Sequence, residues 1–254
     1  MAGKDTNIGA ARARETRAEA GLPEDGPPTC LLTAVEDTLG IPVVIAALPG
    51  EIAGCCVRRD SERTVLWING RHPTARQRFT LAHELGHLRC GHDGNIPAES
   101  FTTLGGKATD SREVQANAFA AELLAPAGAV KAWMGDVRTA SLGQVVLLAA
   151  DFGMSTIAAL YRLNGLGLLD SGYEELQARV LSGDDVALKA ELKPDELDDT
   201  LARTRAADLP RLSPSLHGTA LHAVIRGTAS TSEAARIAGV DPDSLAGGAD
   251  LLGL

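Results

Sequence analysis

The stretch Arg78-Phe-Thr-Leu-Ala-His83-Glu84-Leu-Gly-His87-Leu contains two histidines four residues apart, with a glutamate directly after the first. Side chains four residues apart on a helix lie above one another, with about 5–6 Å between their Cβ atoms. His83 and His87 can therefore each direct an imidazole nitrogen at one zinc ion. Glu84 lies beside that ion, where its carboxylate can accept a proton from a water molecule that the ion activates. The pattern predicts a zinc-dependent hydrolytic site with Glu84 as general base.

The residues around the two histidines indicate that this stretch is helical. Pro73 suits the first turn of a helix, because its missing N–H would be unpaired there in any case. Apolar residues follow on a flank of the helix, namely Phe79, Leu81, Ala82, Leu85 and Leu88. The alternative is a pair of core histidines next to a solvated glutamate, and the helical context favours the metal site over it.

A catalytic zinc site needs a third protein ligand. The metzincin pattern would place it at the tenth position after the first histidine, with a glycine at the seventh, but these positions hold Asp93 and Cys90. His92 is one residue short of the metzincin position, so we expect it at most to contact a ligand or stabilise the transition state. Glu113 begins a second helix that can cross the first. However, Asp110 to Glu113 also has the form of a capping box, in which Glu113 would only satisfy a backbone donor.

The histidine stretch together with this second block resembles the ImmA/IrrE family of metallopeptidases. The second block reads Glu113-x-x-Ala-Asn117-x-Phe119-Ala-Ala-Glu-Leu-Leu-Ala-Pro126. The resemblance rests on the residues within each block and on the number of residues between the two blocks. It covers about residues 29–170.

The resemblance implies roles for particular residues. It implies a gluzincin-like site in which one catalytic Zn²⁺ is held by His83, His87 and Glu113, with Glu84 as general base. Asn117 lies one turn after Glu113 and can orient it, although a surface amide is an equally good interpretation.

The resemblance also implies a function. Members of the family are cytoplasmic, and several cleave a helix-turn-helix repressor to switch on stress, phage or mobile-element genes. We therefore expect a protein substrate, with a DNA-binding repressor as the first candidate. Two alternatives stay open: a regulatory protein that uses the zinc fold as a scaffold without proteolysis, and the toxin or defence component of a two-gene system.

Composition and charge limit the class of protein. The chain has 254 residues, of which 44% are hydrophobic, enough for one sizeable core or two small ones. No run of about 18 apolar residues is present, so we expect no membrane span. The N-terminal residues are polar where a signal peptide would be apolar, so we expect a cytoplasmic protein. The four cysteines lack C-x-x-C spacing, which indicates neither a zinc knuckle nor a disulfide framework.

The part of the chain before the histidine helix predicts a tail and a small sheet. Residues 1–28 are rich in Ala, Arg and Glu and end in a Gly/Pro-rich run, so we expect a flexible tail. Residues 29–135 are expected to form the metallopeptidase core. Strand-like runs in it predict a small mixed sheet packed on the zinc-binding helix pair, hence an α+β fold; they are residues 42–46, 52–57 and 64–68. An edge of this sheet can pair with an extended substrate.

Residues 136–172 predict a helix-turn-helix-like segment, with an apolar helix at 142–150 and a second helix capped by Ser155. A recognition helix presents basic and amide side chains to DNA. This one offers only Ser155, Thr156 and Arg162. The formal net charge of −9 also opposes binding to phosphates. We therefore do not expect direct DNA binding.

The rest of the chain predicts an acidic segment and more helices. Residues 173–208 are expected to form an acidic linker or helix, because residues 174–199 hold nine acidic and three basic side chains. Residues 209–254 predict a C-terminal helical region. In it, Ser230-Thr-Ser-Glu233 has the form of a capping box, and Asp241-Pro242 that of a helix start.

Three residues near the expected site are left with open roles. His92 and Tyr161 are both candidates to stabilise the oxyanion, and each can equally be a helix-packing residue. Cys90 lies three residues after His87, on the side of the helix that faces the metal. Oxidation of this thiol is hypothesised to alter activity, although most such cysteines only fill a core.

Overall fold

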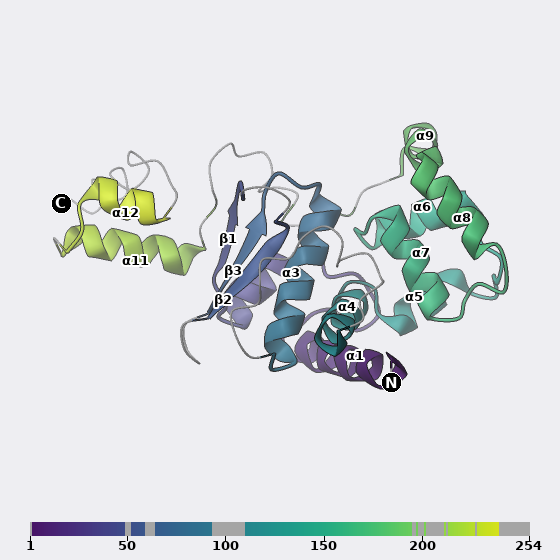
Figure 1. Cartoon of the computed structure of the whole chain (residues 1–254), viewed down its shortest axis with the longest axis horizontal. Coiled ribbons are helices and arrows are strands. Elements are labelled where there is room, and N and C mark those ends of the chain that lie inside the picture. The colour runs from purple at the N-terminus through teal and green to yellow at the C-terminus, as the bar shows by residue number, and fades with distance from the viewer. Residues whose placement is uncertain are drawn as a thin grey trace.

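The computed structural model describes residues 2–48, 52–58, 64–92, 110–194, 197, 201, 211, 213–226 and 228–238. Within these residues the fold is α+β: a three-stranded mixed sheet packed with helices is followed by a mostly helical C-terminal region (Figure 1). This confirms the fold class expected from the sequence. The sheet lies in the middle of the molecule, with later helices on both sides of it (Figure 1).

The sheet consists of β1 (Val43–Ala46), β2 (Gly54–Arg58) and β3 (Thr64–Asn69), in the order β1-β3-β2. β3 is parallel to β1 and antiparallel to β2. All three strands lie where the sequence predicts them. Because side chains alternate between the two faces of a strand, one face supplies a set of buried residues to the core, namely Val43, Ile45, Cys56, Leu66 and Ile68. The short segments α2 (Leu31–Thr33) and η1 (Ala34–Thr38) pack into the same core.

Two helices carry the residues of the expected metal site. α3 (Thr74–Arg89) begins directly after Pro73 and packs against the sheet through Leu81 and Leu85. α4 (Ser111–Leu124) packs against α3 at Gly86. A Cβ atom at Gly86 would lie 3.1 Å from the side chain of Phe119, so the glycine permits the close approach of the two helices.

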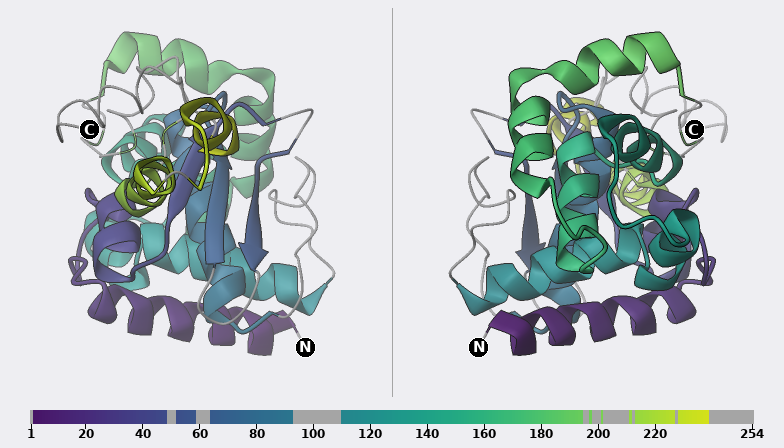
Figure 2. Two further views of the ribbon diagram at one scale, coloured as in Figure 1. Left: turned by 90° about the vertical axis from the view of Figure 1, so that its left-hand side faces the viewer. Right: turned by 90° about the vertical axis from the view of Figure 1, so that its right-hand side faces the viewer.

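The N-terminal region differs from the sequence expectation. Instead of a flexible tail throughout residues 1–28, α1 (Ala2–Glu19) is an 18-residue helix that lies along α4 (Figure 2). Its buried side consists of Gly9, Ala13, Thr16 and Arg17. These positions follow helical spacing, but none of them is a large apolar residue. A search for hydrophobic periodicity therefore misses this helix.

A second group of helices follows α3 and α4, which we call the metal helices, and has a hydrophobic core of its own. It consists of α5 (Ala127–Met134), α6 (Leu142–Asp151), α7 (Thr156–Gly165), α8 (Tyr173–Ser182) and α9 (Asp184–Leu192). α6 and α7 meet at a bend of 101°. Their assignment as a helix-turn-helix stays a prediction. The acidic segment after them is helical over α8 and α9, and it packs on this core through Leu176.

The C-terminal helices α11 (Pro214–Ile225) and α12 (Thr231–Ala238) lie on the other side of the sheet from α5 to α9 (Figure 1). Ser230 and Glu233 form the predicted capping box, because the Glu233 N–H donates to Ser230 Oγ and the Ser230 N–H donates to Glu233 Oε2. The helix start predicted at Asp241 lies outside the described residues. Among the described residues, no single helix is long and apolar enough to cross a membrane. One pair of described helices, α6 with α7, is long and apolar enough when taken together, but the pair is sharply bent.

Candidate metal centre

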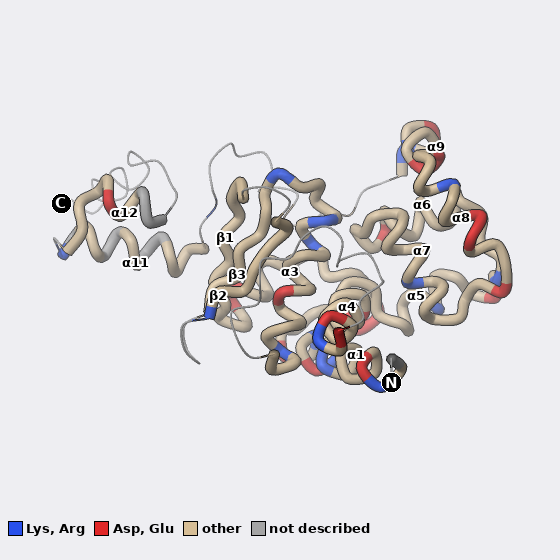
Figure 3. The backbone as a smooth tube through the Cα atoms, viewed as in Figure 1, with Lys and Arg blue, Asp and Glu red and all other residues tan. Residues whose placement is uncertain are grey.

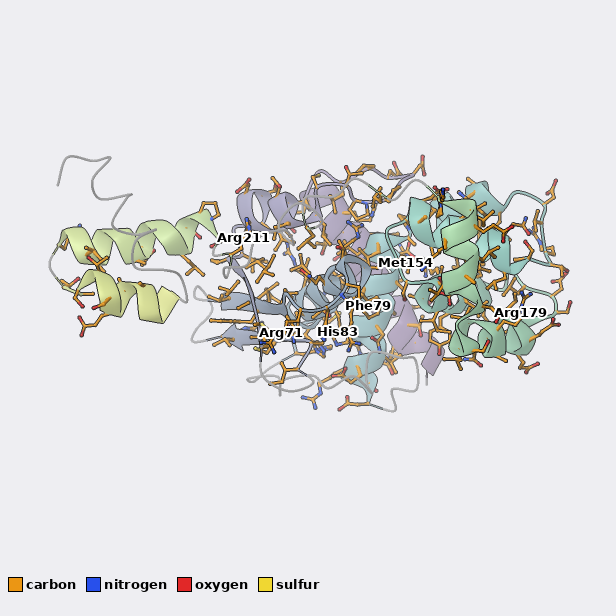
Figure 4. All side chains as sticks on the ribbon, turned by 90° about the horizontal axis from the view of Figure 1, so that it is seen from above. Arg71, Phe79, His83, Met154, Arg179 and Arg211 are labelled. Carbon is orange, nitrogen blue, oxygen red and sulfur yellow. The ribbon has the colours of Figure 1, made fainter. Side chains whose placement is uncertain are left out.

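Three side chains from the two metal helices converge on one point. His83 and His87 come from successive turns of α3, and Glu113 comes from the first turn of α4. The two Nε2 atoms lie 3.0 Å apart. Glu113 Oε2 lies 3.4 Å from Nε2 of His83, and Glu113 Oε1 lies 3.4 Å from Nε2 of His87. His83 lies near the middle of the molecule, with its ring stacked on that of Phe79 (Figure 4).

These distances match what one zinc ion requires. Ligand atoms about 2.0–2.1 Å from a tetrahedral ion lie about 3.3 Å from one another. The three observed separations are close to that value, and two histidines with one glutamate form a donor set typical of catalytic zinc sites. Both histidines are buried and Glu113 is half-buried. The residues present therefore fit a zinc ion.

The local sequence of α4 explains why Glu113 is directed at the histidines. The side chain of Asp110 caps this helix by accepting a hydrogen bond from the Arg112 N–H at 2.8 Å. The capping requirement is thus met by Asp110. The carboxylate of Glu113 faces His83 and His87, which favours a metal ligand over a capping residue.

Electrostatics at this point favour the charged carboxylate. Burial by itself raises the pKa of Glu113, but hydrogen bonds and charge interactions with His83 and His87 outweigh burial and hold this pKa well below its ordinary value. Glu113 is therefore ionised at neutral pH, as a metal ligand must be.

The comparison with known families agrees with this geometry. The family model Peptidase M78, described as the IrrE N-terminal-like domain, matches residues 36–164. The chain belongs to the M78 peptidase family. The match covers just over half of the chain and contains all three converging residues. It confirms the resemblance to ImmA/IrrE metallopeptidases and makes the protein a zinc metallopeptidase by family. A comparison with curated proteins found none that matches.

Glu84 of this M78 peptidase lies in the interior, directly after the first histidine. Its side chain is fully buried, and β2 packs close to it. A Cβ atom at Gly54 would lie 3.5 Å from Glu84 Cγ and 2.5 Å from Thr80 Cγ2. Gly54 therefore allows this strand to lie directly against the helix that carries the candidate base.

His92 contacts one of the candidate ligands. Its Nδ1 atom lies 2.8 Å from Nδ1 of His87, and its Nε2 atom lies 3.1 Å from Oε1 of Gln115. Burial lowers the pKa of His92, so its imidazole is neutral at pH 7. His92 therefore lies against His87, and a role in orienting that residue stays a prediction. Stabilisation of the transition state by this residue stays a prediction.

The remaining two candidates are placed differently. Asn117 is half-buried one turn after Glu113 on α4, and its orienting role stays a prediction. Tyr161 lies on α7, where its hydroxyl accepts a hydrogen bond from Gln177 of α8 at 3.3 Å. α7 packs into the separate core of α5 to α9, and this hydrogen bond of Tyr161 joins α7 to α8. Stabilisation of an oxyanion by Tyr161 stays a prediction.

Two residues near the M78 site are not identifiable from the sequence. Gln115 bonds to His92, and its amide in turn donates to Asp5 of α1 at 2.8 Å. Gln115 belongs to no recognised pattern, although its position two residues after Glu113 places it near the ligands. Asp5 lies in a region where the sequence predicts a tail, so no local signal points to it.

Proposed function

We propose that this M78 peptidase holds one Zn²⁺ through His83, His87 and Glu113 and hydrolyses peptide bonds in a protein substrate with Glu84 as general base. The observation that carries the proposal is the convergence of two imidazole nitrogens and the two oxygens of Glu113. The nitrogens lie 3.0 Å apart, and each lies 3.4 Å from one of the oxygens. Glu84 follows the first ligand directly on the same helix.

The division of labour follows from the side chains. When bound, zinc supplies a Lewis acid that polarises a carbonyl group and lowers the pKa of water. Glu84 takes the proton from the attacking water and passes it to the leaving amine. His92 fixes the ring of His87 from the side opposite to its ligand atom.

The sheet supports binding of an extended substrate at β2. The outer edge of β1 is already bonded, because Ile45 and Arg211 exchange two backbone hydrogen bonds of 2.9 and 2.8 Å. Among the described strands, β2 pairs with β3 alone and so has an open edge. The first residue of this strand, Gly54, lies against the side chain of Glu84. A peptide that pairs with β2 would bring its backbone to the candidate site without reading much of its sequence.

We further propose that the substrate is a helix-turn-helix repressor, which is recognised by protein contact and not through shared DNA. The residues of the second helix that could read DNA have other roles. Ser155 caps α7, Thr156 is buried, and Arg162 donates to the carbonyl of Ala125 and to the Glu122 carboxylate. Few charged residues lie along α6 and α7 (Figure 3), and the net charge is −9.

The test compares new protein N-termini in host cells that express the native protein or Glu84→Gln, under stress and at rest. We expect new ends in a helix-turn-helix regulator that depend on Glu84, while the variant retains zinc. Glu175→Gln, which makes the same change on an exposed position of α8, serves as the control and should cut like the native protein. Equal cutting by Glu84→Gln would show that Glu84 is not the base. Full biological activity without any Glu84-dependent end would favour the regulatory scaffold.

A further inference from the structure

A continuous chain of hydrogen bonds joins the metal centre to the N-terminal helix. Nδ1 of His87 and Nδ1 of His92 lie 2.8 Å apart, Nε2 of His92 and Oε1 of Gln115 lie 3.1 Å apart, and Nε2 of Gln115 donates to Oδ1 of Asp5 at 2.8 Å. These hydrogen bonds connect α3 and His92, which lies just after α3, to α4 and then to α1. They end at a residue outside the region that the family model matches.

The carboxylate of Asp5, at the end of this series of hydrogen bonds, sets the direction of the bonds. A carboxylate can only accept, so the amide NH₂ of Gln115 must face Asp5 and its carbonyl oxygen must face His92. Nε2 of His92 therefore carries a hydrogen and donates it to Gln115, which leaves Nδ1 of His92 as the nitrogen that accepts. The hydrogen between the two rings then belongs to Nδ1 of His87. Nε2 of His87, which faces His83 and Glu113, is left with its lone pair.

We propose that α1 helps to position a ligand of the metal centre. Asp5 and Gln115 are positioning residues that act through His92 and hold His87 in the one tautomer that can bind a metal through Nε2. The proposal rests on the metal site proposed for His83, His87 and Glu113. It adds a role for the N-terminal helix, which lies outside the family match.

The packing of α1 fixes Asp5 in place. Gly9 lies one turn after Asp5 on the same side of the helix. A Cβ atom at Gly9 would lie 2.1 Å from the backbone oxygen of Gln115, so the two helices touch at the residue that Asp5 binds. Further along, Arg14 donates to Glu122 at 3.2 Å and Arg17 donates to the carbonyl of Leu123. α1 is thus bonded to α4 from Gln115 to its last turn.

Zinc affinity of the full-length protein is the first measurement, made by competition with a chromophoric chelator. Loss of a residue that orients a metal ligand lowers metal affinity by about 10–100-fold. We expect a loss in this range for Gln115→Leu and a smaller loss for Asp5→Ala. Asp5→Asn keeps an oxygen that can accept from Gln115 but can also donate, so its loss of zinc affinity should be no larger than that of Asp5→Ala. Glu15→Ala removes the same charge from an exposed position on α1 and should have no effect.

The tautomers supply a second readout that does not depend on activity. In the zinc-free protein, ¹⁵N–¹H correlation spectra of the histidine rings should show hydrogen on Nδ1 of His87 and on Nε2 of His92. In Gln115→Leu, this preference should be lost while the helical content is retained. Hydrogen on Nε2 of His87 in the native protein, or native zinc affinity in Gln115→Leu, would overturn the proposal. Neither readout requires cleavage, so failure of the peptidase proposal in the Glu84→Gln experiment is distinguishable from failure of this one.

Discussion

Single residues set the geometry of the metal centre, and Gly86 is the clearest case. It lies between the two histidines on α3, where α4 comes closest. The distance of 3.1 Å between a Cβ atom at this position and the ring of Phe119 is shorter than an ordinary contact. Any side chain at position 86 must therefore displace Phe119 by a few tenths of an ångström, and α4 carries both Phe119 and Glu113.

We predict that Gly86→Ala destabilises the protein by about 1–3 kcal/mol, the usual cost of an overpacked core, and weakens zinc binding. Chemical denaturation and chelator competition measure the two effects. Gly143→Ala is the matched control, because a Cβ atom on this α6 residue meets nothing closer than 3.8 Å. Alanine favours a helix over glycine, so the control should be neutral or slightly stabilised. Equal behaviour of the two variants would contradict the role assigned to Gly86.

The thiols also differ residue by residue. Burial raises the pKa of Cys55 and Cys90, and burial together with the Glu84 carboxylate raises the pKa of Cys56 to about 11. A raised thiol pKa leaves less thiolate at neutral pH, and thiolate is the reactive form. Cys30 is the exposed cysteine.

We therefore predict that hydrogen peroxide or iodoacetamide modifies Cys30 first, as mass spectrometry of short exposures would show. Cys90→Ser should respond to peroxide like the native protein, in contrast to the hypothesis that this residue is a redox sensor. Rapid modification of Cys90, ahead of Cys30, would restore that hypothesis.

Among the elements, α1 shows what local sequence patterns do and do not determine. α3 and α4 are predictable because both carry a motif with a chemical reason for its spacing. The strands are predictable because alternating and β-branched runs lie between turn residues. α1 is missed because its contact side is made of Gly9, Ala13 and Thr16, which carry almost no hydrophobic signal.

The same reasoning applies to the residues of the site. His83, Glu84 and His87 follow from spacing within one helix, and Glu113 follows from the resemblance. The bond between Asp5 and Gln115 joins residues 110 positions apart in sequence, and only the folded chain brings them together. The hydrogen bond of Tyr161 to Gln177 of α8 depends on which helices pack together, and spacing does not determine that. The role suggested for Tyr161 at the site stays a prediction.

The contact between α1 and α4 at Gly9 can be tested by substitution. Gly9→Ala places a methyl group 2.1 Å from a backbone oxygen, which cannot move without α4. We expect α1 to separate from α4, with faster hydrogen exchange in α1 and in the last turns of α4. The paired control is Gly3→Ala in the same helix, where a Cβ atom meets nothing within 4 Å. Unchanged exchange in Gly9→Ala would show that α1 is not held by this contact.

Across the whole molecule, two arginines, Arg78 and Arg162, connect α3 and α4 to the group of helices α5 to α9. Arg78 of α3 donates through Nε to the carbonyl of Gly153, in the turn between α6 and α7, at 3.1 Å. Burial lowers its pKa to about 10, so it stays charged at neutral pH. Arg162 of α7 pairs with Glu122 of α4, where Glu122 is buried and the Arg162 side chain is 11% exposed. Each metal helix therefore has its own polar link to α6 and α7.

The link through Glu122 can be broken from one side. Glu122→Ala leaves Arg162 buried beside α4 without its carboxylate, and it also removes the partner of Arg14. Loss of one member of a buried ion pair costs about 3–5 kcal/mol, because the other charge stays out of water. We expect a loss of this size in chemical denaturation, whereas Glu15→Ala, which breaks the exposed pair of Glu15 and Arg12, should change stability little. Of the stability lost in Glu122→Ala, Glu122→Leu should regain less than Glu122→Gln, because only glutamine can still accept a hydrogen bond from Arg162. If all of these variants unfold like the native protein, the two groups of helices are held together by apolar contacts and not by this ion pair.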